Sequence, residues 1–232
     1  MGKFIIGTLR KGKVFFYINS VLRTYKLKRI PFTMKFHPTN QNSFLVGSNN
    51  KKILQFDIDT GTKTFEYSQH SGTINTIDFI EENKFVSSAD DKKLFVWEYG
   101  IPVVTKHVSD PEMHTITATA IHPGGEYYAG QSSDNQICIY ENKGGNFRRI
   151  RSKKFASHYS AGYACAIDFS NDGQFLISGD ERGKLVFYDW KTSKTYRTID
   201  AHPSVCIGAE WHPSDPNMVV TCGWEGQVKL WQ

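Results

Sequence analysis

Residues 70–97 read HSGTINTIDFIEENKFVSSADDKKLFVW, and this stretch decides how the chain folds. A loop carrying a histidine leads into an apolar strand, a turn, a second strand, another turn and a third strand that ends in tryptophan. Similar phrases follow with a spacing of 44 residues, beginning at His70, His114, His158 and His202. A fixed period of this length predicts a repeat protein whose units are four-stranded blades.

The aromatic residue that ends each third strand extends the repeat in both directions. Successive spacings are 40, 41, 43, 48 and 43 residues, for Phe16, Phe56, Trp97, Tyr140, Tyr188 and Trp231. FIIGT at residues 4–8 matches FLVGS at 44–48, which predicts a degenerate blade at the start of the chain. We therefore expect one repeat domain over 1–232, divided into a partial blade at 1–30, blades at about 31–69, 70–113, 114–157 and 158–201, and a partial blade at 202–232.

The strand count indicates an all-β propeller that is incomplete. Four full blades flanked by two three-stranded pieces give about five to six blades, whereas a closed propeller of this repeat type commonly has about seven. We therefore expect the chain to be a fragment of a longer propeller or the product of a truncated reading frame. Unpartnered sheet edges invite association with other chains, so something is expected to cover them.

The blades carry the residues of a known repeat family. A loop histidine, an aspartate in the turn after the second strand and a closing tryptophan resemble the WD repeat, here as His70, Asp91 and Trp97. That resemblance implies a buried hydrogen-bonded network through a strand hydroxyl, for which Ser87 is the expected residue. A buried imidazole needs such partners, so all four loop histidines are predicted to be structural. The implied network residues are His70, Ser87, Asp91, Trp97, His114, Asp134, His158 and His202.

Other repeats depart from this pattern at the turn position. The aspartate is replaced by Arg10, Asn50, Arg182 and Glu225. Asparagine and glutamate can still accept a hydrogen bond from histidine, whereas arginine cannot. The repeats with arginine are therefore expected to lack the network, or to use Asp180 in its place.

The second half of the chain is more specific than the general repeat. AGYAC at 161–165, SGD at 178–180, DWKTSK at 189–194, AHPSVCIGAEWHP at 201–213 and TCGWEGQVKLW at 221–231 resemble the closing blades of a family of WD-repeat pre-mRNA splicing factors of the second catalytic step. The resemblance implies a non-catalytic scaffold in the nucleus. Its implied partners are spliceosomal proteins, with small nuclear RNA or pre-mRNA as further contacts, and neither a membrane nor a small-molecule substrate.

An adaptor of another WD-repeat class is the alternative. A substrate receptor of a ubiquitin ligase commonly carries Trp-Asp-x-Arg after a third strand, but the corresponding places read FDID, WEYG, YENK and YDWK. A histone-tail reader needs an acidic pore lined by aromatic residues, which sequence does not reveal. The first adaptor is therefore disfavoured, and the second stays open.

Charge is distributed unevenly along the chain. Residues 1–56 contain eleven lysines and arginines and no acid, leaving 17 basic against 23 acidic side chains in the rest. Such a field attracts phosphate backbones or acidic proteins, although a solvated strand face is the simpler explanation. The N-terminal residues that we expect to contact RNA or a partner are Arg10, Lys11 and Lys13.

A second basic segment, NKGGNFRRIRSKKF at 142–155, lengthens one repeat interval to 48 residues. Strand alternation predicts that Arg149, Arg151 and Lys153 share one face with Phe147. Such a face offers phosphate contacts and a ring for base stacking, but it equally fits a charged edge that discourages sheet association. The predicted contacts to RNA or a partner are Lys143, Arg148, Arg149, Arg151, Lys153 and Lys154.

No motif in the chain predicts catalysis. G-x-S-x-G, P-loop and HExxH patterns are absent, and the pairs Glu81-Glu82 and Asp90-Asp91 are expected to be solvated turn charges. Cys138, Cys165, Cys206 and Cys222 have no CxxC spacing, so buried thiols are favoured over a metal site or disulfides. We expect no cofactor and no catalytic or metal-binding residue.

Overall fold

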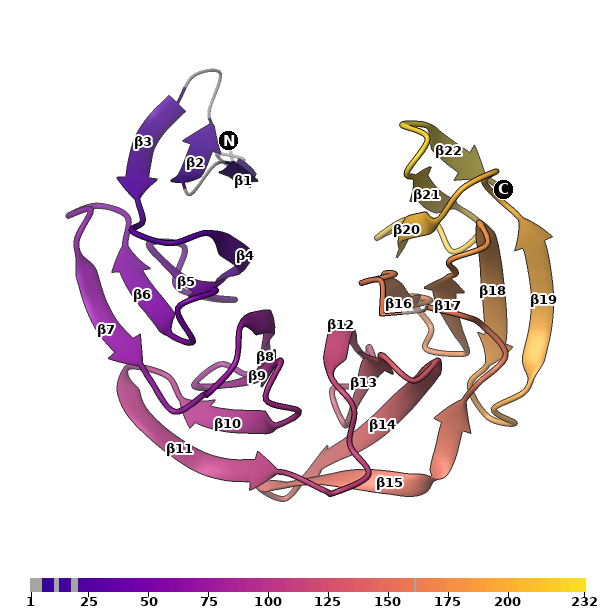
Figure 1. Ribbon diagram of the computed structural model, residues 1–232, viewed down its shortest axis with the longest axis horizontal. Helices are drawn as coiled ribbons and strands as arrows, with labels where there is room; N and C mark the ends of the chain where they lie inside the picture. Colours follow the sequence, from indigo (N-terminus) through magenta and orange to yellow (C-terminus); the bar gives the residue numbers. More distant parts are fainter. Residues whose placement is uncertain (1–5, 11–12, 18–20, 161) are drawn as a thin grey trace. The chain divides into compact units, whose positions relative to one another are not determined.

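The computed structural model describes residues 6–10, 13–17, 21–160 and 162–232, with side chains from residue 23 onward. The chain divides into two compact units, Met1–Met113 and His114–Gln232. Every regular element in the described ranges is a β-strand, and within each sheet the strands that are consecutive in sequence pair antiparallel (Figure 1). The predicted all-β fold, built from blades of the WD-repeat type, is confirmed.

The first unit contains one sheet of three strands and two sheets of four. Its three-stranded sheet is β1 (Ile6–Arg10), β2 (Lys13–Tyr17) and β3 (Val21–Lys26). The next sheet is β4 (Pro31–Phe36), β5 (Ser43–Ser48), β6 (Ile53–Asp57) and β7 (Lys63–Tyr67). The third is β8 (Ile74–Glu81), β9 (Lys84–Ala89), β10 (Leu94–Glu98) and β11 (Ile101–Val108).

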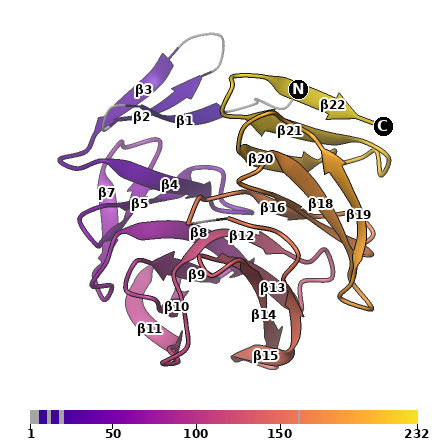
Figure 2. The same ribbon diagram turned by 45° about the vertical axis from the view of Figure 1, so that its right-hand side comes forward.

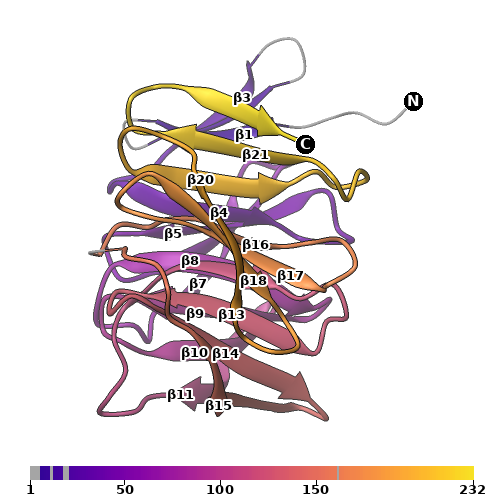
Figure 3. The same cartoon turned by 90° about the vertical axis from the view of Figure 1, so that its right-hand side faces the viewer.

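The second unit contains two sheets of four strands and one of three. They are β12 (Ile116–Ile121), β13 (Tyr127–Ser132), β14 (Gln136–Lys143) and β15 (Asn146–Phe155); then β16 (Ile167–Phe169), β17 (Phe175–Gly179), β18 (Lys184–Asp189) and β19 (Thr195–Asp200); then β20 (Cys206–Trp211), β21 (Val219–Gly223) and β22 (Val228–Trp231). Figure 2 shows β18 beside β19, and Figure 3 shows β20 beside β21. One sheet thus falls within each predicted repeat.

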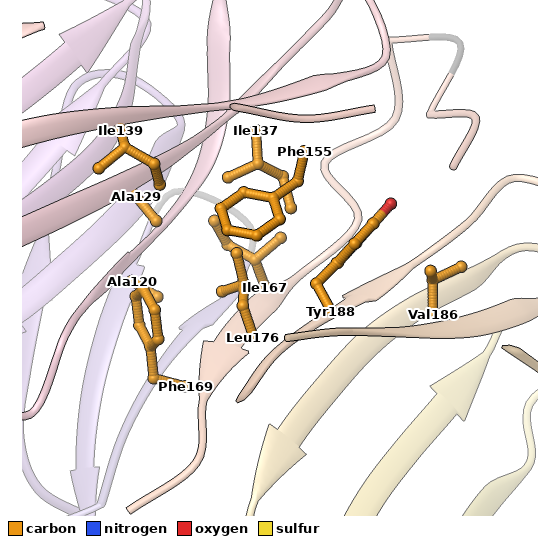
Figure 4. Close-up of a cluster of buried hydrophobic side chains, with 10 residues drawn as sticks. All are labelled: Ala120, Ala129, Ile137, Ile139, Phe155, Ile167, Phe169, Leu176, Val186 and Tyr188. Carbon is orange, nitrogen blue, oxygen red and sulfur yellow. The ribbon is translucent and has the colours of Figure 1, made fainter. Parts of the chain in front are cut away.

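Apolar side chains of consecutive sheets form the core between them. In the second unit, five residues of the β12–β15 sheet meet five of the β16–β19 sheet, as Figure 4 shows. In the first unit, Leu45, Ile53 and Tyr67 from one sheet pack with Phe85 and Trp97 from the next. Full burial of each large apolar side chain contributes about 1.5–3 kcal/mol, so this packing holds neighbouring sheets together.

The loop that leads into the last sheet is tied to the preceding sheet by close backbone contacts. Gly183, in the turn between β17 and β18, has a φ of +79°, and its carbonyl accepts hydrogen bonds from the backbone N–H groups of Ala201 and His202. A Cβ at this position would lie 1.9 Å from the carbonyl oxygen of His202. Glycine therefore allows the turn to approach the loop that carries the last repeat histidine.

Candidate functional site

The His70 network joins a loop, a strand and a turn of one sheet. The Nδ1–H of His70 donates to Oδ2 of Asp91 at 2.9 Å, and Oγ of Ser87 lies 2.8 Å from its Nε2. The indole Nε1–H of Trp97 donates to the same hydroxyl at 2.8 Å. Since Ser87 accepts from the indole, its own proton is directed to Nε2, which leaves the Nδ1 tautomer of histidine.

Asp91 also fixes the loop that follows the histidine. Its Oδ2 accepts the backbone N–H of Ser71 at 2.8 Å. Burial raises the pKa of Asp91, but hydrogen bonds from His70 and from the Ser71 amide outweigh this effect and hold the pKa below its usual value. The carboxylate therefore stays ionised and serves as a structural acceptor.

His202 forms a matching network in the last repeat. Its Nδ1 contacts Oε1 of Glu225, and its Nε2 lies 2.8 Å from Oγ1 of Thr221. Trp231 donates its indole N–H to that hydroxyl at 2.9 Å. The longer Glu225 side chain thus occupies the place of the turn aspartate, and Thr221 that of the strand serine.

His158 is buried like His70 but has different partners. Its Nδ1 lies 2.8 Å from the hydroxyl of Tyr188, and its Nε2 lies 2.6 Å from Nε2 of Gln131. Gln131 belongs to β13 and Tyr188 to β18, so the imidazole bridges two consecutive sheets. Burial lowers the pKa of His158 to about 4, which keeps the ring neutral at physiological pH.

In the same repeat, a side chain of the turn between β17 and β18 accepts hydrogen bonds from backbone N–H groups, including one of the loop that carries His158. Asp180 is the acid that we expected to replace the missing turn aspartate. Its carboxylate accepts the amide N–H groups of Tyr159 and Arg182 and not the imidazole. Asp180 thus makes the hydrogen bond to the loop backbone that Asp91 makes in the His70 repeat, and it does so without contacting the histidine.

The expected contact between His114 and Asp134 is not formed. His114 is exposed, whereas the preceding residue, Met113, is 3% exposed and takes the inward position of the loop. Asp134 accepts a hydrogen bond from Nε2 of Gln136 at 3.0 Å. The prediction that this pair belongs to the network was wrong, because the apolar methionine is buried in preference to the imidazole.

Most cations of the 142–155 segment bind neighbours within the chain. Arg148 donates from Nε and Nη2 to Oε2 of Glu141 at 2.9 and 2.8 Å, and the Lys143 ammonium lies 3.7 Å from Glu126. Nη2 of Arg149 lies 3.2 Å from the sulfur of Cys138. The two pairs with glutamate reduce the charge that this segment presents to a partner.

Lys153 is held against an aromatic ring. Its ammonium lies 4.1 Å from the ring centroid of Trp190 and donates to the carbonyl of that residue. Burial lowers its pKa. Arg151 and Lys154 are the exposed cations at the end of this strand, and the two aromatic residues of the segment, Phe147 and Phe155, are buried.

The predicted alternation along this strand was wrong. Cys138 on β14 pairs with Lys154, but the adjacent Ile139 pairs with Ile150, so residues 151–153 form a bulge. A bulge interrupts the alternation of side chains between the two faces. As a result, Lys154 lies on the face of Phe147 and Arg149, which strict alternation along the strand would not allow.

The N-terminal basic residues are placed only in part. Arg10 and Lys13 lie opposite one another in β1 and β2, but their side chains are not described, and Lys11 lies outside the described residues. Their contact to RNA or a partner stays a prediction.

The described part of the chain contains no cluster of three or more His, Cys, Asp or Glu residues that could hold a metal ion. All four cysteines are free thiols, and burial raises the pKa of Cys165 and of Cys206 to about 12. No helix that is long and apolar enough to cross a membrane occurs among the described residues.

Sequence reasoning missed Gln131, Thr221 and Tyr188 as partners of the histidines. Thr221 occupies the strand hydroxyl position of Ser87, and Tyr188 is a closing aromatic, whereas Gln131 lies one residue beyond the strand hydroxyl position. Comparing residue types across the aligned repeats could have found Thr221. The bridge made by Gln131 depends on the packing of two sheets and leaves no local signal.

Comparisons with known proteins place these repeats in a family. A model of the WD domain, G-beta repeat, matches residues 61–98, 150–189 and 193–232, which is about half of the chain. The chain is 48% identical over 207 residues to human Pre-mRNA-processing factor 17, covering 88% of this chain and 36% of that protein. It is 32% identical to Pre-mRNA-processing factor 17 of Saccharomyces cerevisiae, covering 87% of this chain and 45% of that protein.

A more distant relative is mouse WD repeat-containing protein 25, with 27% identity over 86% of this chain and 38% of that protein. The chain thus spans between about a third and a half of the length of these relatives. The matched WD domains lie on the sheets described above, including those that contain Trp97 and Trp231. The chain belongs to the WD-repeat family of the G-beta type.

Proposed function

We propose that this chain is a non-catalytic scaffold in pre-mRNA splicing that acts in the nucleus around the second catalytic step. The observation that carries the proposal is the 48% identity over 207 residues to human Pre-mRNA-processing factor 17. A relation of this strength extends well beyond the sparse residues that define a WD repeat. It favours splicing over the alternative of a WD-repeat adaptor of another class.

The geometry supports a role in binding. The buried histidines His70, His158 and His202 contact structural partners inside the sheets, as a repeat framework requires. A general base has to reach a substrate proton, and these imidazoles face protein groups instead. Function is therefore assigned to exposed loops and strand edges, where a platform holds its partners.

Depletion of the protein from a splicing-competent nuclear extract tests the second-step role. We expect cleaved first exon and lariat intermediate to accumulate, because the first transesterification proceeds and the second stalls. Adding back purified protein should restore spliced product. Unchanged splicing after complete depletion, or a block before the first step, would contradict the proposal.

We propose the outer strand β15 as one contact for a spliceosomal protein. Replacing Arg148, Arg149 and Arg151 by Glu should weaken association with the spliceosome. Reversal of the exposed Lys93, Lys191 and Lys194 is the matched control, with the same change of net charge. Equal recovery of both variants at physiological salt would remove β15 from the interface.

A further inference from the structure

A second group of basic residues lies in the first unit, on the segment between β3 and β4. Tyr25 is buried, and Leu27 packs against the same apolar cluster with Phe44 and Phe56. Because side chains of an extended chain alternate, the lysines beside these two residues, Lys26 and Lys28, point away from the core and are exposed. The alternating pattern thus produces one apolar and one basic side.

The residues that follow Lys28 are also largely exposed to solvent. Arg29 is exposed, Ile30 is 56% exposed, and Phe32 is 55% exposed on either side of the buried Pro31. The exposure of Phe32 contrasts with the basic strand β15, where both phenylalanines are buried. The β3–β4 segment, unlike β15, therefore combines exposed cations with an exposed phenylalanine ring.

A neighbouring turn brings a further cation to this segment. The backbone N–H of Asn49 donates to the carbonyl of Ile30 at 3.1 Å, which fastens the turn between β5 and β6 to the segment. Lys51 lies in that turn, has a φ of +69° and is exposed. Two separate pieces of sequence thus contribute positive charge to one surface. We call it the β3–β4 surface, made of Lys26, Lys28, Arg29, Ile30, Phe32 and Lys51.

The cations of this surface are not neutralised by the protein. Nearby basic residues have partners: Lys35 pairs with Asp78 at 2.8 Å, and Lys52 and Lys63 both contact Glu66. Within the described ranges, no carboxylate lies at ion-pair distance from any of the four cations on the β3–β4 surface. Their charge is therefore available to an external ligand.

We propose that the β3–β4 surface binds single-stranded RNA, an inference that rests on the proposed splicing function. Lysine and arginine would neutralise successive phosphates, and the exposed ring of Phe32 would stack on one base. Single-stranded RNA suits this arrangement because its bases are free to leave the backbone and lie on an aromatic ring. An acidic protein segment would form ion pairs with the cations, but its carboxylates would not stack on the ring of Phe32.

Fluorescence anisotropy with the purified chain and a labelled, unstructured oligouridine tests the proposal across a range of salt concentrations. Charge reversal by K28E, R29E and K51E together should weaken binding about tenfold or more at low salt. It should also reduce the slope of log affinity against log salt by about 2, as expected for three lost phosphate contacts. The K93E, K191E and K194E control should stay within about twofold of wild type.

A separate variant tests base stacking. F32L keeps an apolar side chain but removes the ring, and we expect about fivefold weaker binding with an unchanged salt slope. Circular dichroism and thermal melting of each variant confirm that the sheets are intact. Equal binding by F32L and wild type would overturn the stacking part of the proposal.

Polyglutamate as a competitor separates RNA from an acidic protein partner. Capture of polyglutamate, but not of oligouridine, by the β3–β4 surface would overturn the proposal in favour of a protein. Unaltered RNA affinity in the triple variant would overturn it as well. If small nuclear RNAs are recovered with the protein from extract while the purified chain binds no RNA, this inference fails and the splicing proposal stands.

Discussion

His70 and His158 occupy the same position in two repeats, and both are buried, yet they are held by different partners. His70 contacts the turn carboxylate of Asp91 and the hydroxyl of Ser87 within its own sheet. His158 contacts Tyr188 and reaches Gln131 in the preceding sheet. Two imidazoles that are both buried at this position thus bind different groups, because the residues around them differ.

The surroundings of His70 and His158 differ in charge as well as in geometry. At His70 an ionised carboxylate faces the ring, whereas at His158 both partners are neutral side chains. A neutral environment makes protonation of His158 costly, in agreement with its lowered pKa. The first site fastens a loop to a turn, and the second fastens one sheet to the next.

The largest expected effect comes from His70→Ala. Removal of the imidazole leaves the Asp91 carboxylate and the Ser87 hydroxyl without their buried partner and opens a cavity. We expect a loss of about 2–4 kcal/mol in the free energy of unfolding, measured by chemical denaturation. A loss below about 0.5 kcal/mol would show that the network does not stabilise this sheet.

Ser87→Ala compared with Ser178→Ala sharpens the contrast between the two repeats. Ser87 serves two buried groups, His70 and Trp97, whereas Ser178 donates to the carbonyl of the adjacent Gly179. Ser87→Ala should cost about 2 kcal/mol, and Ser178→Ala about 1 kcal/mol or less, in the same denaturation experiment. Equal losses would indicate that hydroxyls at this position act alike in both repeats.

The pH dependence of stability tests His158. Because its folded pKa of about 4 lies below the unfolded value of 6.5, its contribution is fully present above pH 6.5 and is lost as pH falls toward 4. We expect this residue to make the protein about 1 kcal/mol less stable at pH 5 than at pH 6. His158→Gln should remove that part of the slope, and a slope unchanged in this variant would assign it to other groups.

The smallest effect is expected from His114→Ala. This histidine stands at the same repeat position as His70 but is exposed. Its substitution should change the free energy of unfolding by about 0.5 kcal/mol at most, as is usual for surface positions. A loss as large as that of His70→Ala would mean that His114 is buried in solution and that Met113 is not.

The fold could be predicted from the chain because its signals are local. Alternating apolar residues, turn residues and the spacing of the closing aromatics define each strand, and the sheets form in the predicted order. Ser87 and Asp91 could be named as partners of His70 because all lie in one repeat, at positions characteristic of the family.

Two kinds of feature could not be predicted in this way: contacts between neighbouring sheets, and irregularities within a strand. The Gln131–His158 contact joins side chains 27 residues apart through packing, and the β15 bulge changes which cations share a face. Counting lysines and arginines also overstated the available charge of the 142–155 segment, since Arg148 pairs with Glu141 and Lys143 with Glu126. Whether a cation is available depends on neighbours that only the folded structure brings together.

Co-purification tests the central claim most directly. The tagged protein is recovered from nuclear extract at moderate salt, and the bound RNA is probed for the spliceosomal small nuclear RNAs. The splicing assignment predicts their enrichment over an untagged control and over a tagged WD-repeat protein unrelated to splicing. Recovery of ubiquitin-ligase subunits or histones without these RNAs would contradict it and favour a WD-repeat adaptor of another class.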